Sequence, residues 1–300
     1  MTDQRDRTET DIEQGRVLVL ADLHLDIWVR SGLDPLALIP AETWSSLDAL
    51  IIAGDLSNNP LGSWPVDLRK IGAHMPLDRV HLFPGNHDYF SHALDDEAIM
   101  GRAAVRVGAN FAQKAQIVVG RTRFLCCTLW TDFELLGDPV AAKAAAYRGM
   151  TDYRSIFMTM GDFRVLRPDH TLAVHRDHRA WLESSLAEAF DGETIVVTHH
   201  APVPDGVRQP VDELGPAFGS DLRELIEAHQ PRAWYFGHTH WPFRGRVGRT
   251  EVINFSVGYP SEVPVEGAAA FMTRGLVTLG RNGAPAVAAP AAAGDGGASE

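Results

Sequence analysis

Short apolar runs of strand length recur along the chain and alternate with amphipathic stretches of helical length. The runs lie within residues 16–24, 47–55, 79–87, 115–130 (two runs), 193–200, 232–240 and 250–258. In one intervening stretch, Leu182, Leu186 and Phe190 are spaced four apart, which predicts one face of a helix, and residues 220–231 show a similar pattern. Strands that alternate with helices predict a layered α/β domain whose sheets are buried between helices.

Three segments depart from this alternation. Residues 131–170 are rich in aromatic and charged side chains and are a candidate cap over one end of the domain. Residues 1–15 are mostly polar and charged, and we expect a flexible N-terminus there. Residues 282–300 form an Ala/Pro/Gly tract that cannot bury enough apolar surface to become ordered. We therefore expect one domain over residues 16–281.

The composition narrows the class of protein. The first sixteen residues lack the apolar segment of an export signal, and no run of about 18 apolar residues predicts a membrane span. Cys126 and Cys127 are adjacent within an apolar run, which is typical of packed thiols in a reducing compartment, so we expect a cytoplasmic protein with no membrane partner. A formal charge of −12 without a Lys/Arg cluster argues against binding to nucleic acid.

Carboxylate, amide and imidazole side chains stand at the ends of five of the apolar runs. In chain order they are Asp22 and His24, Asp55, Asn86 and His87, His199 and His200, and His238 and His240. Loops at the carboxyl ends of parallel strands converge on ligands, so we expect these side chains to meet at one edge of the sheets. Within Asp22-Leu-His24 and His238-Thr-His240, the spacing of two places both side chains on one face of an extended chain.

Each of these residues has an ordinary structural explanation when it is taken alone. A single Asp after a strand is usually a turn residue or a helix cap, and a single buried His is usually a hydrogen-bonded core residue. That explanation does not account for a whole set at the same end of successive runs, while His74, His92, His170, His175 and His178 fall elsewhere. The joint pattern favours a metal centre.

The donor types indicate which metals suit the centre. Imidazole and carboxylate with one neutral amide and no thiolate favour Mn, Fe, Zn, Co or Ni over a calcium cage or a structural zinc site. The donors are too many for one ion, whereas two ions about 3.5–4 Å apart that share a carboxylate would use them, and such pairs activate water for displacement at phosphorus. Two divalent ions would also outweigh Asp22, Asp55 and a bridging hydroxide, so the pocket would stay positive in an acidic protein.

The order D-x-H, G-D, G-N-H-D, H and G-H-x-H over residues 22–240 resembles the calcineurin-like metallophosphoesterases. The resemblance implies a four-layer α/β/β/α sandwich with its site at the C-terminal ends of the strands. It implies the following metal ligands: Asp22, His24 and His240 for the first ion, Asp55 as the bridge, and Asn86, His199 and His238 for the second ion. It also makes His87 the non-ligand histidine that assists the leaving group while a metal-bridging hydroxide attacks.

Departures from the wider family narrow the resemblance. Asp55 is followed by Leu-Ser-Asn-Asn, without the Val-Asp-Arg-Gly of phosphoprotein phosphatases, and Asp88 stands where those enzymes usually have Glu. The residues around Asp55 also lack the tyrosine that a purple acid phosphatase needs. The pattern is most similar to the small bacterial phosphodiesterases, including the "THHAPVP" loop.

The favoured function is therefore hydrolysis of a small soluble phosphoester, with a phosphodiester preferred. A phosphomonoesterase, a nuclease of the same superfamily, and a metal-dependent binding or regulatory module stay open, although the last has no use for His87. His200 either packs behind its strand or leans into the substrate pocket. Asp132, Asp152 and Arg154 could reach over the site from the cap, but we expect a solvated or salt-bridged surface role for each.

Overall fold

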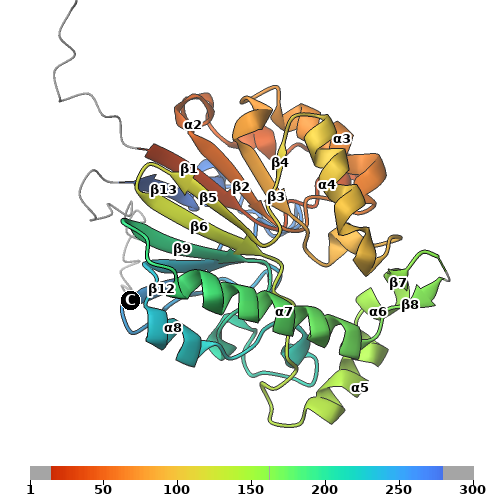
Figure 1. Cartoon of the computed structure of the whole chain (residues 1–300). Coiled ribbons are helices and arrows are strands. Elements are labelled where there is room, and N and C mark those ends of the chain that lie inside the picture. Colours follow the sequence, from red (N-terminus) through yellow and green to blue (C-terminus); the bar gives the residue numbers. More distant parts are fainter. Residues whose placement is uncertain (1–14, 162, 280–300) are drawn as a thin grey trace, which may run out of the picture.

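The computed structural model describes residues 15–161 and 163–279. The predicted flexible N-terminus, apart from Gly15, and the predicted disordered tail over residues 282–300 lie outside these described residues. Within them the chain forms two large sheets that face each other and carry helices on their outer sides (Figure 1). The predicted α/β class is therefore confirmed.

The first sheet has the strand order β13-β1-β2-β3-β4. Its strands are β1 (Gly15–Leu20), β2 (Ala49–Ala53), β3 (Val80–Phe83), β4 (Asn110–Phe111) and β13 (Leu276–Leu279). Strands β1 to β4 are parallel, and β13 pairs antiparallel with β1 at the edge. The parallel strands require crossover connections, and the helices of the outer layer supply most of them.

The second sheet has the strand order β11-β12-β10-β9-β6-β5. Its strands are β5 (Ala115–Val119), β6 (Thr122–Cys127), β9 (Glu193–Thr198), β10 (Ala233–Phe236), β11 (Arg244–Val247) and β12 (Thr250–Asn254). The inner strands β6, β9, β10 and β12 are parallel, and β5 and β11 are antiparallel edge strands. Every predicted apolar run contains one of the strands, whereas the runs did not predict β4, β11 or β13.

Alternating side chains divide the interior into three apolar clusters, which define four layers. In β1, Val17 and Val19 face the cluster between the sheets, whereas Leu18 faces the cluster beneath the helices of the first sheet. In the second sheet, Val196 lies in a third cluster together with Leu182 of the outer helix layer. Strands buried on both faces read as continuous apolar runs, which is why the sequence shows them so clearly. The predicted α/β/β/α sandwich is confirmed.

The adjacent cysteines follow the same alternation. Cys126 packs in the cluster between the sheets, and Cys127 packs on the opposite face of β6 against the outer helices. Both thiols are buried and free, and burial raises their pKa above the ordinary value. The prediction of packed thiols is confirmed.

Helices cover the outer faces of both sheets. The helices are α1 (Leu25–Arg30), α2 (Ala41–Ser46), α3 (Pro60–Ile71), α4 (Glu97–Arg106), α5 (Pro139–Gly149), α6 (Asp152–Ser155), α7 (Pro168–Ala187), α8 (Arg223–His229) and α9 (Ala268–Met272). Short 3-10 turns span Leu36–Leu38, Leu77–Arg79, His87–Tyr89, Leu94–Asp96, Pro204–Gly206 and Gly215–Ala217. Both predicted helices are present, but α7 ends at Ala187, so Phe190 lies beyond it.

The candidate cap is a small helical and hairpin unit at the side of the sandwich. It contains α5, α6 and the hairpin of β7 (Phe157–Thr159) with β8 (Arg164–Val165), which project beyond the sheets (Figure 1). Backbone hydrogen bonds from Ser91 N to Ser155 O (2.8 Å) and from Phe157 N to His92 O (2.9 Å) join this unit to the loop after β3. In the part of the chain that the structure describes, no helix is long and apolar enough to cross a membrane.

Candidate metal centre

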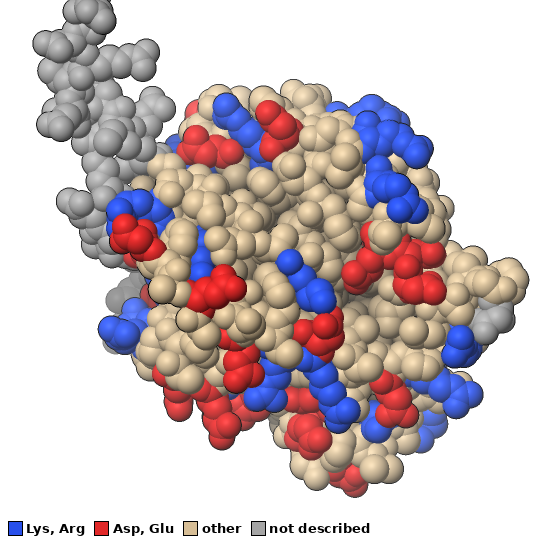
Figure 2. All heavy atoms as spheres, in the orientation of Figure 1, with Lys and Arg blue, Asp and Glu red and all other residues tan. Residues whose placement is uncertain are grey.

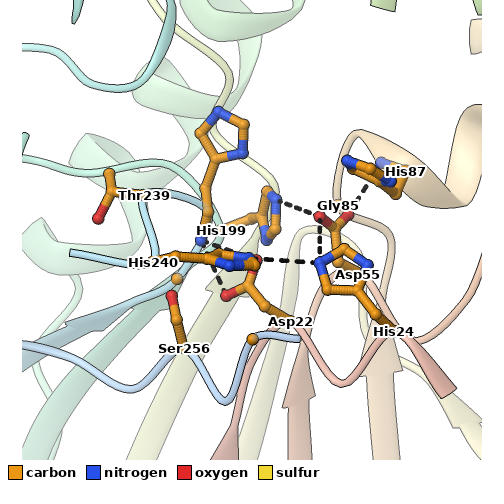
Figure 3. Close-up of polar contacts among 12 residues, drawn as sticks. Asp22, His24, Asp55, Gly85, His87, His199, Thr239, His240 and Ser256 are labelled. Atoms are coloured by element: carbon orange, nitrogen blue, oxygen red, sulfur yellow. Dashed lines mark hydrogen bonds and ion pairs between the residues drawn. The ribbon is translucent and has the colours of Figure 1, made fainter. Parts of the chain in front are cut away.

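The predicted ligands meet at one edge of the sandwich. Asp22 and His24 follow β1, Asp55 follows β2, Asn86 and His87 follow β3, His199 follows β9, and His238 and His240 follow β10. The parallel strands of each sheet end on the same side, so five loops from two sheets supply one cluster of side chains (Figure 3).

One half of the cluster contains Asp22, His24 and His240. Potential ligand atoms of these three residues all lie within 4.8 Å of one another. His240 Nε2 lies 3.4 Å from Asp22 Oδ1 and 3.3 Å from His24 Nε2. Figure 3 shows the three side chains directed toward one another. This is the group that the resemblance assigns to the first ion.

The other half contains Asn86, His199 and His238. Ligand atoms of His199, His238 and Asp55 lie within 4.8 Å of one another. His199 Nε2 lies 3.0 Å from Asn86 Oδ1 and 3.5 Å from Asp55 Oδ2. The Asp55 carboxylate also lies 3.8 Å from His24 Nε2. Asp55 is therefore the carboxylate that faces both halves of the cluster.

Local backbone conformation places these side chains. Five of the seven predicted ligands have a left-handed backbone: Asp22 (φ 56°), His24 (42°), Asp55 (56°), His238 (64°) and His240 (47°). Non-glycine residues adopt this region at a cost of about 1–3 kcal/mol, and such residues concentrate at functional sites. Because this backbone conformation costs free energy, the surrounding fold must hold the five residues in it. The conformation directs their polar side chains into the cluster.

The glycines of the motifs allow the loops to approach one another. A Cβ at Gly85 would collide with Asp55 Oδ1 and with the ring of His199, and a Cβ at Gly54 would collide with the same ring. Gly54 also has φ +85°, which side chains rarely adopt. The glycine before Asp55 and the glycine before Asn86 are thus required by close packing of the ligands.

Asp88 holds two of the motif loops together from below. Its buried carboxylate accepts hydrogen bonds from the backbone N–H groups of Asp55 (2.7 Å) and Gly85 (2.8 Å). It also accepts from Trp64 Nε1 (2.9 Å) and Ser57 N (3.3 Å). Burial and the nearby Asp55 raise its pKa to about 7 despite these donors. The aspartate that replaces the glutamate of phosphoprotein phosphatases is therefore a structural anchor.

The charges of the cluster perturb its imidazoles in opposite directions. Burial alone would lower the pKa of His199, but Asp55 and Asp22 outweigh it and raise that pKa to about 9. Burial likewise opposes a charged His240, but Asp22 raises its pKa to about 9. In contrast, burial lowers the pKa of His24 to about 4 and that of His238 well below the ordinary value. The centre thus contains neutral imidazoles beside carboxylates, which is a donor set for a cation.

One ring nitrogen supports the fit of a metal. Among the described residues, His238 Nε2 is buried without a hydrogen-bond partner, and His238 belongs to the same donor group as Asp55. Buried polar atoms are nearly always paired, so an unpaired imidazole nitrogen in such a group fits a bound cation. Imidazole, carboxylate and amide donors suit the transition metals predicted from the sequence. The residues present therefore fit the metal that the resemblance implies.

His87 lies beside the cluster on the 3-10 turn after Asn86. Its backbone N–H donates to Asp55 Oδ1 (2.9 Å), and its ring packs edge-on against His24 with centroids 4.7 Å apart. Its Nδ1 lies 3.1 Å from Asn58 Oδ1, and Asn58 Nδ2 donates to Asp26 Oδ2 (3.2 Å). Because Asp26 accepts from the Asn58 amide, the carbonyl oxygen of that amide faces His87, so His87 Nδ1–H is the donor in this contact and Nε2 takes no part in it.

Glu262 supports His240 from the loop after β12. Glu262 Oε2 lies 2.7 Å from His240 Nδ1 and accepts from Tyr259 N (2.8 Å). A carboxylate on one ring nitrogen fixes the tautomer and leaves the other nitrogen to bind metal. The Tyr259 ring packs against His24 and His240 with centroids 4.8 and 5.0 Å away. This loop therefore completes the first half of the cluster.

The structure shows the surroundings of four further residues near the motifs and in the candidate cap. His200 packs behind the centre, where it is buried with Nδ1 3.2 Å from Thr128 O and its ring 4.2 Å from that of His238. Arg154 donates to Arg148 O (2.7 Å) at the end of α5, in agreement with a surface role. Asp132 lies 3.9 Å from His175 and is partly exposed. The surface role expected for Asp152 is wrong, because Asp152 is buried and accepts from Asn86.

Sequence reasoning missed Asn58, Glu262 and the contact of Asp152. Asn58 lies in the Leu-Ser-Asn-Asn segment after Asp55. The absence of Val-Asp-Arg-Gly from that segment gave no indication of a role for Asn58. Glu262 follows the predicted strand at 250–258. Polar side chains after the carboxyl ends of the other strands were taken as candidate site residues, and the same criterion would have identified Glu262. Asp152 is 66 residues from Asn86 in the chain and carries no local signal.

Comparison with known proteins agrees with the geometry. Residues 15–242 match the calcineurin-like phosphoesterase family, whereas no curated protein matches the chain. Phosphopantetheinyl hydrolase (PptH) from Mycobacterium tuberculosis has a similar structure, with a TM-score of 0.64, 18% identity, and coverage of 83% of this chain and 91% of that chain. A putative 5'-nucleotidase from Staphylococcus aureus has a TM-score of 0.47 and 14% identity. That match covers 81% of this chain and 48% of the other chain. At 18% identity, the likeness to PptH shows the fold alone. The family match spans most of the chain, so the chain belongs to the calcineurin-like phosphoesterases and is a metal-dependent phosphoric ester hydrolase.

Proposed function

We propose that the chain is a dinuclear phosphoesterase that hydrolyses a small soluble phosphoester, with a phosphodiester favoured. The observation that carries this proposal is the position of Asp55. Its carboxylate lies 3.8 Å from His24 Nε2 in one half of the cluster and 3.5 Å from His199 Nε2 in the other. A carboxylate in that position is suited to bridge two ions.

The proposed ligands are those named from the motifs. Asp22, His24 and His240 hold the first ion, Asp55 bridges, and Asn86, His199 and His238 hold the second. When bound, such ions supply an activated water and withdraw charge from the phosphoryl oxygens. The left-handed backbone at most of the ligands keeps them in place before the ions arrive.

His87 is the proposed proton donor to the leaving oxygen. Asn58 holds its Nδ1–H, so Nε2 is the nitrogen that can serve the substrate. The Asp26 carboxylate behind Asn58 accepts from this amide and so orients its oxygen toward His87. A regulatory module that only bound metal would not need this arrangement.

The contacts of two arginines are compatible with a diester. Arg154 donates to the carbonyl of Arg148, and Arg274 donates to the carbonyls of Phe271 and Ser256. Both guanidiniums are directed at backbone carbonyls in this arrangement, and we expect neither to bind the second negative charge of a monoester. A diester carries one charge, which the metal ions can balance.

The surface supports a small substrate over a nucleic acid. On the face drawn in Figure 2, basic side chains occur in small groups separated by acidic ones. The formal charge of −12 would repel a polyanion unless a continuous basic groove opposed it. A small substrate is therefore the preferred candidate, and a nuclease of the same family ranks second.

Metal analysis followed by a substrate screen tests the proposal. Purified protein loaded with Mn, Zn, Fe, Co or Ni would be assayed on aryl phosphodiesters, aryl monoesters and single-stranded DNA. A phosphopantetheinyl diester belongs in the screen because the enzyme PptH carries that name. We expect two ions per chain and a higher kcat/KM for diesters. Activity on neither ester with any metal, or a single bound ion, would contradict the proposal.

A further inference from the structure

The amide of Asn86 contacts the metal cluster on one side and the cap on the other. Its Oδ1 lies 3.0 Å from His199 Nε2, and its Nδ2 donates to Asp152 Oδ1 at 2.7 Å. Asn86 and Asp152 are both only 3% exposed. The hydrogen bond is therefore shielded from water, where it is stronger than on the surface.

The two ends of an amide differ in what they can bind. The oxygen can bind a cation, whereas the NH2 group only donates hydrogen bonds. A half-turn about the last side-chain bond exchanges them without changing the shape of the side chain. Something other than shape must therefore decide which end of Asn86 faces the cluster.

Asp152 supplies that decision. An ionised carboxylate only accepts hydrogen bonds, so the NH2 group of Asn86 must face it and Oδ1 must face His199. In the reverse orientation, the amide oxygen would lie against a carboxylate oxygen in a buried site. The negative charge behind the NH2 group also increases the electron density on Oδ1, as carboxylates do behind metal-binding imidazoles.

The fold holds Asp152 in place for this task. It is the first residue of α6, and the next residue, Tyr153, has its hydroxyl 3.1 Å from Thr171 Oγ1 of α7. The end of α6 is fixed to the loop after β3 by the hydrogen bond from Ser91 N to Ser155 O. The helix that carries Asp152 is thus anchored both to the outer helix layer and to the ligand loop.

Burial of this carboxylate is costly for the fold. Asp152 is only 3% exposed, and its carboxylate lies against the Asn86 amide and not in solvent. A nearby carboxylate of the cap shows the usual alternative, because Asp169 pairs with Lys143 at 2.6 Å on the surface. A buried carboxylate that accepts from an amide of the metal site and makes no ion pair with a cation in the described residues is better explained by that amide than by stability.

We propose that Asp152 is a positioning residue that turns the carbonyl oxygen of Asn86 toward the second metal position. The inference rests on the proposed dinuclear site and extends it to the cap, because residues 139–165 then take part in metal binding through one side chain. It gives this segment a function other than covering the substrate.

Metal affinity measured by competition with a chromophoric chelator tests the inference. Asp152→Ala removes the acceptor, and we expect one of the two dissociation constants to rise by about 10–100-fold while the other changes less than about threefold. Asp152→Asn keeps an acceptor oxygen for the Asn86 amide, so we expect its affinity to recover to within a few-fold of wild type. Cobalt spectra of the loaded proteins should show altered coordination of one ion in Asp152→Ala and wild-type coordination in Asp152→Asn.

Two controls make the outcomes decisive. Asp169→Ala removes a surface carboxylate of the same region and should leave both metal affinities unchanged. If Asp152→Ala fails to fold, Asp152→Leu replaces it, because leucine fills a similar volume without an acceptor. Unchanged affinities in the folded variant, or equal losses in Asp152→Ala and Asp152→Asn, would overturn the inference. Failure of wild type to bind two ions would instead overturn the proposed function.

Discussion

His87 is the residue at which proton donation and charge stabilisation can be separated. It contacts Asn58 through Nδ1 and belongs to neither of the predicted ligand sets. We expect His87→Ala to keep two ions and to lose about a hundredfold to ten-thousandfold on alkyl or ribose esters, since general acid help has that size. The loss should be much smaller on a p-nitrophenyl ester, whose anion leaves without a proton.

Paired assays on the two ester types with metal analysis check this prediction. Equal losses on both esters would indicate that His87 stabilises the charged phosphoryl oxygens instead. Loss of an ion in His87→Ala would show that His87 is a ligand. That outcome is sterically feasible, because potential ligand atoms of His87, His24 and Asp55 lie within 4.8 Å of one another.

Asp55 should differ from the other carboxylate of the centre. Its carboxylate lies near ligand nitrogens of both halves of the cluster. The Asp22 carboxylate lies near the ring nitrogen of His240 in the first half, and its contact with the second half is with the backbone N–H of His238 and not with a ligand nitrogen. We expect Asp55→Asn to lower occupancy at both positions and to abolish hydrolysis. Asp22→Asn should chiefly weaken the first ion. Metal counting by mass spectrometry under native conditions distinguishes the two, and an Asp55→Asn protein with two ions and normal turnover would rule out the bridge.

At the scale of elements, the close approach of the loops after β2 and β3 controls the site. A Cβ at Gly85 would collide with Asp55 and His199, neither of which can move without displacing a ligand. We expect Gly85→Ala to lower the free energy of unfolding by about 1–3 kcal/mol, the usual cost of overpacking. It should also reduce metal occupancy strongly.

Gly161→Ala is the matched control for this change. Gly161 is exposed in the turn between β7 and β8, and an added Cβ there makes only an ordinary contact with Thr159. Chemical denaturation and metal counting on both variants make the comparison. A Gly85→Ala protein with normal stability and two ions would show that the loops have room that the structure does not indicate.

The elements also explain what the sequence could predict. Strands buried on both faces are continuous apolar runs, and ligand loops follow their C-terminal ends, so the order of polar residues along the chain predicted where Asp55 and His199 would meet. The antiparallel edge strand β5 was predicted, whereas β11 was missed because it is half exposed and reads as Arg-Gly-Arg-Val. Asp152 was misassigned because its partner comes from a distant loop, and no local periodicity reports a contact of that kind.

At the scale of the whole molecule, the proposed metal centre would join the two sheets. Asp22 and Asp55 extend from the first sheet, and His199 and His240 extend from the second. A ligand that binds only the folded state stabilises it by about 2.7 kcal/mol at a concentration 100 times its dissociation constant. Ions bound at the proposed centre would therefore contribute to the stability of the sandwich as well as to the chemistry.

The same charges make metal binding depend on pH. In the metal-free protein, Asp55 and Asp22 raise the pKa of His199 to about 9, and Asp22 raises that of His240 to about 9, in both cases against the effect of burial. These raised values stabilise the metal-free fold below the unfolded pKa of about 6.5, and the contribution is lost as pH rises through about 9. Metals bind neutral imidazole, so below about pH 9 each ion must displace a proton from the folded protein.

We therefore expect metal affinity to rise with pH up to about pH 9, for example across pH 6.5 to 9, and then to level off, with protons released at neutral pH. His24 should release none, because burial has already lowered its pKa to about 4. Calorimetric titrations in buffers of different ionisation enthalpy count the protons, and chelator competition gives the affinity at each pH. Asp22→Asn removes the main carboxylate that raises the pKa of His240, so it should release up to one proton fewer. Affinity that stays constant across this range would show that both imidazoles are neutral before the ions bind.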